Sequence, residues 1–211
     1  MGVEPLSPHS LRVALAEIVA RDHDMAAVVE RFGPPPLWAR RPGFSTLVRI
    51  ILEQQVSLRS AAAAYARLQA VAGRVTSARV ASVSERDLRA AGLTRQKAAY
   101  CHGLASAVVA GGLDLGGLDR LPDDEVRSVL VELPGIGPWT ADIYLLIALR
   151  RPDIWPSGDL ALARALQGVK RLRRIPSADH MSRIARAWAP WRAVAARVLW
   201  HFYLSSGRRT A

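Results

Sequence analysis

Cysteine is nearly absent from this 211-residue sequence, and its scarcity excludes several kinds of site. The lone thiol of Cys101 cannot form an intrachain disulfide or a four-cysteine zinc or iron–sulfur centre. His, Cys and Asp residues show no cluster typical of a catalytic metal, so we expect no required cofactor. No apolar run is long enough to span a bilayer, and no signal-peptide pattern opens the sequence. We therefore expect a cytoplasmic protein with no membrane partner.

Acidic residues are also scarce. The chain has 18 Asp and Glu against 29 Lys and Arg, which gives a net charge of +11 and a pI near 11.2. Residues 160–211 hold eleven basic residues and one acid, Asp179. This excess favours a polyanionic partner, with nucleic acid ahead of an anionic membrane.

The apolar residues recur at helical rather than strand spacing, as in Leu11, Leu15 and Ile18. Gly and Pro at 33–36 and at 41–43 separate the first helical regions. The pattern predicts an all-α fold, and the length allows one domain or two small ones.

Residues 133–159 (LPGIGPWTADIYLLIALRRPDIWPSGD) contain the most informative pattern. Gly135 and Gly137 flank Ile136 in a turn without bulky side chains, so two backbone N–H groups can point at a phosphate. Pro138 suits the first position of a helix, whose positive end would strengthen the same anion site. The pattern therefore predicts a hairpin that binds a DNA backbone.

This segment and three others resemble the helix-hairpin-helix (HhH-GPD) DNA glycosylase superfamily, in particular its AlkA-like DNA-3-methyladenine glycosylase II branch. The other blocks, which follow the family's order over roughly residues 44–204, are IILEQQVS at 50–57, AGLTRQKA at 91–98, and WAPWR at 188–192 with LW at 199–200. Four ordered blocks make a chance match improbable.

The resemblance implies two helical subdomains with the active-site cleft between them. One would consist of residues 1–45 plus 151–211, and the other of residues 46–150, ending in a helix-hairpin-helix at about 123–149. It also implies a base-excision-repair enzyme that acts on damaged double-stranded DNA and hydrolyses the N-glycosidic bond of flipped-out alkylated purines, such as 3-methyladenine and 7-methylguanine. We expect a monomer that associates with the bacterial nucleoid through DNA.

Asp159 matches the family's catalytic aspartate. Breaking a purine–deoxyribose bond builds positive charge on the sugar, and a buried carboxylate aimed at that charge lowers the barrier. The carboxylate can also orient or deprotonate the attacking water. The alternative is that Asp159 caps the helix that begins at Leu160, and both roles can hold together.

Three residues match positions of the family's base pocket. Trp139 and Trp200 would stack on an electron-deficient base, although each can equally be a core tryptophan. Ile143 stands where AlkA has a pocket tyrosine, which leaves the range of accepted bases open. Trp139 also replaces the lysine with which bifunctional members form a Schiff base, so the resemblance implies a monofunctional enzyme that leaves an abasic site.

The remaining assignments concern DNA contacts. Gln55, with Gln54 beside it, matches the segment that supplies the family's wedge, where AlkA has an apolar residue; the alternative is a polar helix end. We expect backbone-phosphate contacts from the hairpin, and from Arg95 and Lys97 either phosphate contacts or simple solvent exposure. The hairpin contacts would come from Gly135, Ile136, Gly137 and Thr140, and a structural monovalent cation would bind the carbonyl groups of Val131, Leu133 and Ile136.

Two alternatives to this function remain open from the sequence. A helix-hairpin-helix alone can serve as a sequence-independent grip on DNA, so the chain can be a non-catalytic binding protein. It can also be a glycosylase for a different damaged base. Asp159, Trp139 and Trp200 argue against the first alternative, because backbone binding needs none of them.

Overall fold

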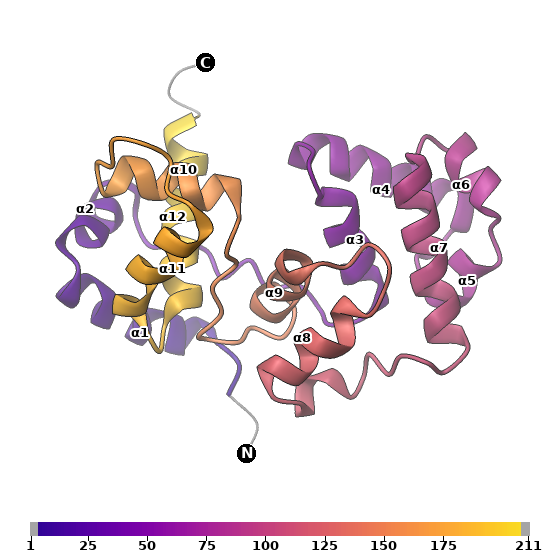
Figure 1. The fold of residues 1–211 in the computed structure, drawn as a ribbon, viewed down its shortest axis with the longest axis horizontal. Coiled ribbons are helices and arrows are strands. Elements are labelled where there is room, and N and C mark those ends of the chain that lie inside the picture. Colours follow the sequence, from indigo (N-terminus) through magenta and orange to yellow (C-terminus); the bar gives the residue numbers. More distant parts are fainter. Residues whose placement is uncertain (1–3, 208–211) are drawn as a thin grey trace. The chain divides into compact units, whose positions relative to one another are not determined.

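The computed structural model describes residues 4–207, which form twelve α-helices, two short 3-10 helices and no strand (Figure 1). The expected all-α fold is confirmed. Contacts group the described residues into two compact units, one of residues 40–144 and the other of residues 4–39 and 145–207. No helix in this part of the chain is long and apolar enough to cross a membrane.

The central unit is built around α7, which packs against α3, α5 and α6. Polar side chains start four of its helices: the oxygens of Ser57, Thr76, Ser84 and Thr94 each accept the N–H three residues further on. Its elements are α3 (Phe44–Glu53), α4 (Leu58–Ala72), α5 (Ser77–Ala81), α6 (Glu85–Ala90), α7 (Arg95–Val109), η1 (Leu118–Arg120), α8 (Asp123–Val131) and α9 (Pro138–Ile147), whose residues from Leu145 onward belong to the terminal unit.

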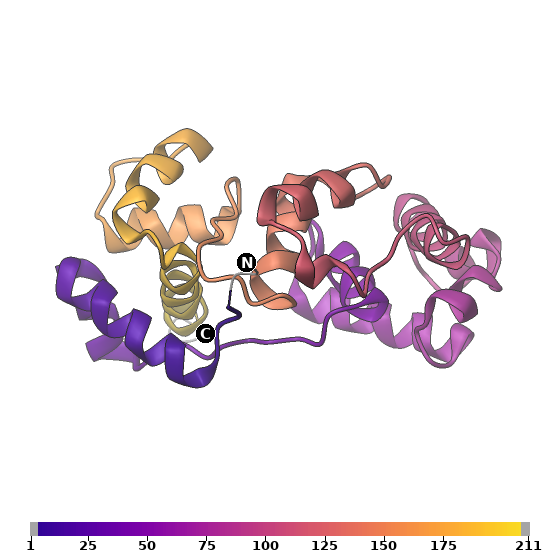
Figure 2. The ribbon, with the colours of Figure 1, turned by 90° about the horizontal axis from the view of Figure 1, so that it is seen from below.

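The terminal unit joins the two ends of the chain around α12, whose residues 193–199 are all buried. Figures 1 and 2 show α1 and α2 on one side of α12 and α10 and α11 on another, and α12 contacts α1, α2 and α10. The elements are α1 (Pro8–Arg21), α2 (His23–Phe32), α10 (Leu160–Val169), α11 (Ala178–Ala185), η2 (Arg186–Trp188) and α12 (Arg192–Gly207).

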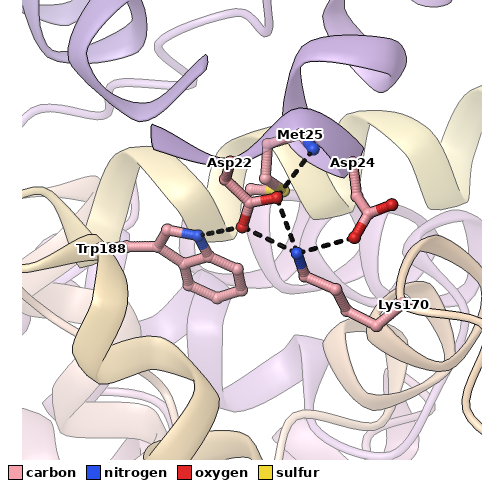
Figure 3. A network of polar contacts seen from close by, with 5 residues as sticks. All are labelled: Asp22, Asp24, Met25, Lys170 and Trp188. Carbon is pink, nitrogen blue, oxygen red and sulfur yellow. Dashed lines mark hydrogen bonds and ion pairs between the residues drawn. The ribbon is translucent and has the colours of Figure 1, made fainter. Parts of the chain in front are cut away.

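A charged network ties these distant segments together (Figure 3). The Asp22 carboxylate, between α1 and α2, accepts hydrogen bonds from Lys170 Nζ at 2.6 and 2.8 Å and from Trp188 Nε1 at 2.8 Å. Asp24 accepts a further bond from Lys170 at 2.9 Å. Burial acts to raise the pKa of Asp22, but the bonds from Lys170 and Trp188 outweigh it and the pKa is lowered.

A buried guanidinium connects three more segments of the terminal unit. Arg197 is fully buried and donates to the carbonyl oxygens of Leu37, Ala193 and Leu146 at 2.9, 2.9 and 2.7 Å. Burial lowers its pKa to about 10, so the group stays charged at neutral pH. The chain passes from one unit to the other after residues 39 and 144. The bonds of Arg197 hold residues 37 and 146, next to these two points, within the terminal unit.

The unit boundaries lie six residues before the expected ones, at 39/40 and 144/145 instead of 45/46 and 150/151. Arg40 belongs to the central unit because it pairs with Glu53 at 2.7 Å. Gly43 belongs there because its N–H donates to the Tyr144 hydroxyl at 2.9 Å. The expected boundaries came from the family resemblance, which does not show where these side chains bind.

Candidate functional site: the hairpin and Asp159

The hairpin joins α8 to α9, and its first glycine is required by the fold. Ile136 N–H donates to the Leu133 carbonyl at 3.0 Å and closes the turn. Gly135 has φ +86°, and a Cβ placed there would lie 2.2 Å from Tyr100 Cγ. The left-handed backbone and the adjacent ring both exclude a side chain.

Gly137 is different, because nothing in the protein lies within 4 Å of a Cβ placed on it. It is exposed and immediately precedes α9, whose hydrogen bonds begin with Ala141 N–H to the Gly137 carbonyl at 3.1 Å. The N–H groups of a helix's first turn have no acceptor within the helix and carry its positive end. The open space beside Gly137 thus lies next to N–H groups that suit an anion.

One hairpin contact expected from the sequence needs correction, and another is narrowed to the backbone. The Ile136 N–H is used inside the turn, and its side chain is only 4% exposed. The Thr140 hydroxyl is buried and accepts a hydrogen bond from Gln54, so the phosphate contact predicted for Thr140, which stays a prediction, would come from its backbone N–H in the first turn of α9. The phosphate contact predicted for this hairpin therefore rests on the backbone around Gly137 and the start of α9.

Gln54 holds the hairpin from behind. Its Nε2 donates to the Gly135 carbonyl and to Thr140 Oγ1, both at 2.9 Å. An amide committed to these two bonds is not available as a wedge, so this assignment of Gln54 is corrected. The repeated glutamines of the sequence gave no sign of which one turns inward.

Lys97 fixes the end of the helix that presents Gln55. Its ammonium donates to the carbonyl groups of Leu52 and Gln54 at 2.7 and 3.0 Å, at the C-terminus of α3. Burial lowers the pKa of Lys97. The expected phosphate or solvent contact of Lys97 is therefore wrong: its charge is used inside the protein.

Gln55 itself is exposed and has φ +56°, a left-handed conformation that is uncommon for a residue with a side chain. Such a conformation persists where neighbouring contacts determine it. Gln55 is thus exposed next to the α3 terminus that Lys97 binds, and its role as the wedge stays a prediction.

An ion pair that sequence reasoning missed joins the two hairpin helices. Arg127 on α8 donates from Nε to Asp142 on α9 at 2.7 Å, and from a terminal nitrogen to Asp124 at 2.6 Å. Burial acts to lower the pKa of Arg127, but its bonds to Asp142 and Asp124 outweigh this and raise the pKa. This pairing fixes the angle at which α8 and α9 leave the hairpin.

Asp159 lies in the terminal unit, at the N-terminus of α10, and is 8% exposed. Its Oδ1 accepts the Leu162 N–H at 2.8 Å, which is the helix cap the sequence predicted. The same oxygen accepts Trp200 Nε1 at 3.3 Å. The carboxylate is therefore oriented from two directions, and the positive end of α10 favours its negative charge.

The three candidate pocket residues have different surroundings. Trp200 is half-buried beside Asp159, and Trp139 is half-buried in the first turn of α9 in the central unit. Ile143 is 3% exposed, in a run of α9 that is buried throughout. The pocket roles of Ile143 and of the two tryptophans stay predictions.

The structure gives no separate support for a metal. Among residues 4–207, no group of three or more His, Cys, Asp or Glu side chains is arranged to hold an ion. The expected cation on the carbonyl groups of Val131, Leu133 and Ile136 stays a prediction, and one of these, the Leu133 carbonyl, already accepts the Ile136 N–H.

The chain matches a family model and several known proteins. A family model described as "HhH-GPD superfamily base excision DNA repair protein" matches residues 48–190. YfjP of Bacillus subtilis is 26% identical over 184 residues, which cover 83% of this chain and 64% of YfjP, so the chain spans less than two thirds of that relative. DNA-3-methyladenine glycosylase 1 of Schizosaccharomyces pombe is 24% identical over 180 residues, or 83% of this chain and 79% of the relative.

Among solved structures, a DNA-3-methyladenine glycosidase from Bacillus halodurans superposes with a TM-score of 0.76 and 28% sequence identity. The match covers 99% of this chain and 95% of the other.

Proposed function

Because the chain belongs to the HhH-GPD superfamily of base excision DNA repair proteins, we propose that it is a monofunctional DNA glycosylase that releases alkylated purines of the 3-methyladenine and 7-methylguanine type from duplex DNA. The observation that carries the proposal is the buried carboxylate of Asp159, held by Leu162 N–H and by the indole of Trp200. Relatives named DNA-3-methyladenine glycosylase support the choice of substrate class.

The proposed reaction uses the charge of Asp159. As the bond between C1′ and the purine nitrogen breaks, its electron pair leaves with the base and the sugar becomes positive. A fixed carboxylate stabilises that charge without having to reorganise. Water then bonds to C1′ and loses a proton to the carboxylate or to solvent, which leaves an abasic site.

We expect no lyase step, because neither of the two lysines of the chain is available as a nucleophile. Lys97 binds the Leu52 and Gln54 carbonyl groups, and Lys170 lies between Asp22 and Asp24. Neither ammonium is presented as a nucleophile, and Trp139 supplies no amine at the family's Schiff-base position. Strand cleavage should therefore require alkali or a second enzyme.

In this proposal the hairpin holds the DNA backbone and the terminal unit performs the chemistry. Gly137 and the start of α9 would bind a phosphate, because the space beside Gly137 is open and the helix end is positive. Trp139 and Trp200 would stack on the flipped base, and Gln55 would fill the space it leaves in the duplex. Damaged DNA is thus the proposed partner.

The test is release of methylated purines from alkylated duplex DNA by the wild type and by Asp159→Asn. Asparagine caps a helix as well as aspartate does, so the variant should fold. Removal of one electrostatic contact of this kind costs roughly 100- to 1,000-fold in rate. We expect that loss with DNA binding unchanged, and strand breaks from the wild type only after alkali.

Asp179→Asn is the matched control, because Asp179 is an exposed acid in the first turn of α11. It should keep wild-type activity. Release by Asp159→Asn at the wild-type rate would remove Asp159 from the mechanism. Binding without release of any methylated base, by the wild type itself, would point to a different lesion or to a binding protein.

A further inference from the structure

Three arginines surround an open hollow on the central unit, apart from the hairpin residues. The hollow has a volume of about 640 Å³ and is lined by Arg86, Arg89, Ala90, Leu93 and Arg95. Arg86 and Arg89 belong to α6, and Arg95 is the first residue of α7. All three arginines are exposed, whereas Leu93 is a buried lining residue with 5% exposure. We call Arg86, Arg89 and Arg95 the arginine cluster.

The charges of the arginine cluster are not used by the fold. Within residues 4–207, none of its three side chains forms an ion pair or a hydrogen bond. Other arginines of the same unit do: Arg40 pairs with Glu53, and Arg127 pairs with Asp142. The nearby Asp87 carboxylate instead accepts the Ser84 hydroxyl at 2.7 Å. Glu85 and Asp87 lie on the same helix as Arg86 and Arg89, but within residues 4–207 neither acid forms an ion pair with the arginine cluster. Three unpaired guanidinium groups around one hollow favour an anionic ligand from outside the chain.

The arginine cluster is rigidly connected to the hairpin through α7. Tyr100 on α7 fills the space beside Gly135, and Lys97 binds the carbonyl of Gln54, whose side chain holds the hairpin. Arg95 precedes Tyr100 by five residues, which is about 7.5 Å along a helix. One strand of a duplex carries a phosphate about every 3.4 Å of its axis, so a bound duplex offers several phosphates over that distance.

We propose that the arginine cluster is a second binding site for DNA backbone phosphates, which holds the duplex at a distance from the lesion while the hairpin binds near it. Guanidinium groups suit this task, because their paired N–H donors match two phosphate oxygens. Contacts to phosphates carry no sequence information, so the site would fix the position of the duplex without restricting the lesion's sequence context. The inference rests on the proposed function only in taking DNA as the partner.

The test compares Arg86→Gln/Arg89→Gln with Arg74→Gln/Arg79→Gln in the full chain. Arg74 and Arg79 are also exposed arginines of the central unit, and both double variants lose two charges. The affinity for an undamaged duplex is measured at several salt concentrations. Each lost phosphate contact reduces the slope of log K against log salt by about 0.9, so the cluster variant should lose about 1.8. The control variant should keep the wild-type slope.

A single-turnover assay of base release at saturating DNA separates the two proposals. We expect the cluster variant to release the base at the wild-type rate once bound, since its residues act on binding. An unchanged salt slope in the cluster variant, or an equal loss in both variants, would overturn the arginine cluster as a site. A wild type that releases no base, but whose slope of log K against log salt is still steeper than that of the cluster variant, would overturn the enzymatic proposal. The arginine cluster would then stand as a DNA-binding site.

Discussion

Gly135→Ala should destabilise the protein strongly, because two separate costs coincide at this residue. The added Cβ would lie 2.2 Å from Tyr100 Cγ and 2.3 to 2.6 Å from the adjoining ring carbons, next to the root of that side chain. Overpacking of this kind costs about 1–3 kcal/mol. A left-handed backbone at φ +86° adds about 1–2 kcal/mol for a residue with a Cβ. The sum, about 2–5 kcal/mol, is a large part of the 5–15 kcal/mol typical of a folded domain.

Urea unfolding of Gly135→Ala, Tyr100→Ala and the double variant measures both costs. The double variant should regain the overpacking part, so the coupling between the two sites should be about 1–3 kcal/mol. Gly137→Ala is the control: its Cβ meets nothing within 4 Å, so the stability should change by less than about 0.5 kcal/mol. Gly137→Ala should nevertheless weaken DNA binding if a phosphate occupies that space. Additive effects of Gly135→Ala and Tyr100→Ala would refute the steric argument.

Three further variants test contacts described above. Lys97→Met should lower the free energy of unfolding by about 1–3 kcal/mol, because two carbonyl groups lose a charged donor; an unchanged urea midpoint would contradict this. Trp200→Phe keeps an aromatic face but loses the N–H bonded to Asp159, so base release should slow by about tenfold, whereas a wild-type rate would show that this bond is dispensable. The pKa of Asp22 is lowered in the fold, so its bond to Lys170 contributes its full stabilisation above the ordinary pKa of 3.8. That stabilisation is lost as the pH falls through the lower pKa of the folded state. In thermal unfolding, the stability difference between the wild type and Asp22→Asn should therefore shrink over that acidic range.

The resemblance read from the sequence and the helical spacing led to the correct fold class, and the hairpin glycines and Asp159 stand where local rules place them. The sequence did not distinguish the two glycines or the two glutamines. Gly135 is required by the ring of Tyr100, whereas Gly137 meets open space. Gln54 turns inward to the hairpin, whereas Gln55 is exposed. Each difference depends on whether a residue distant along the chain packs against the position or leaves it open.

The sequence alone determined the features that depend on residues within one helical turn. Asp159 caps its helix through Leu162, three positions away, and such bonds form between residues that the chain already holds together. The tertiary structure alone decided which side chains meet across long separations: Gln54 with Gly135 over 81 positions, Lys97 with Leu52 over 45, and Trp200 with Asp159 over 41. The physical reason is that a hydrogen bond needs its two atoms within about 3 Å, a distance that helical periodicity fixes for neighbours and only packing fixes for distant residues.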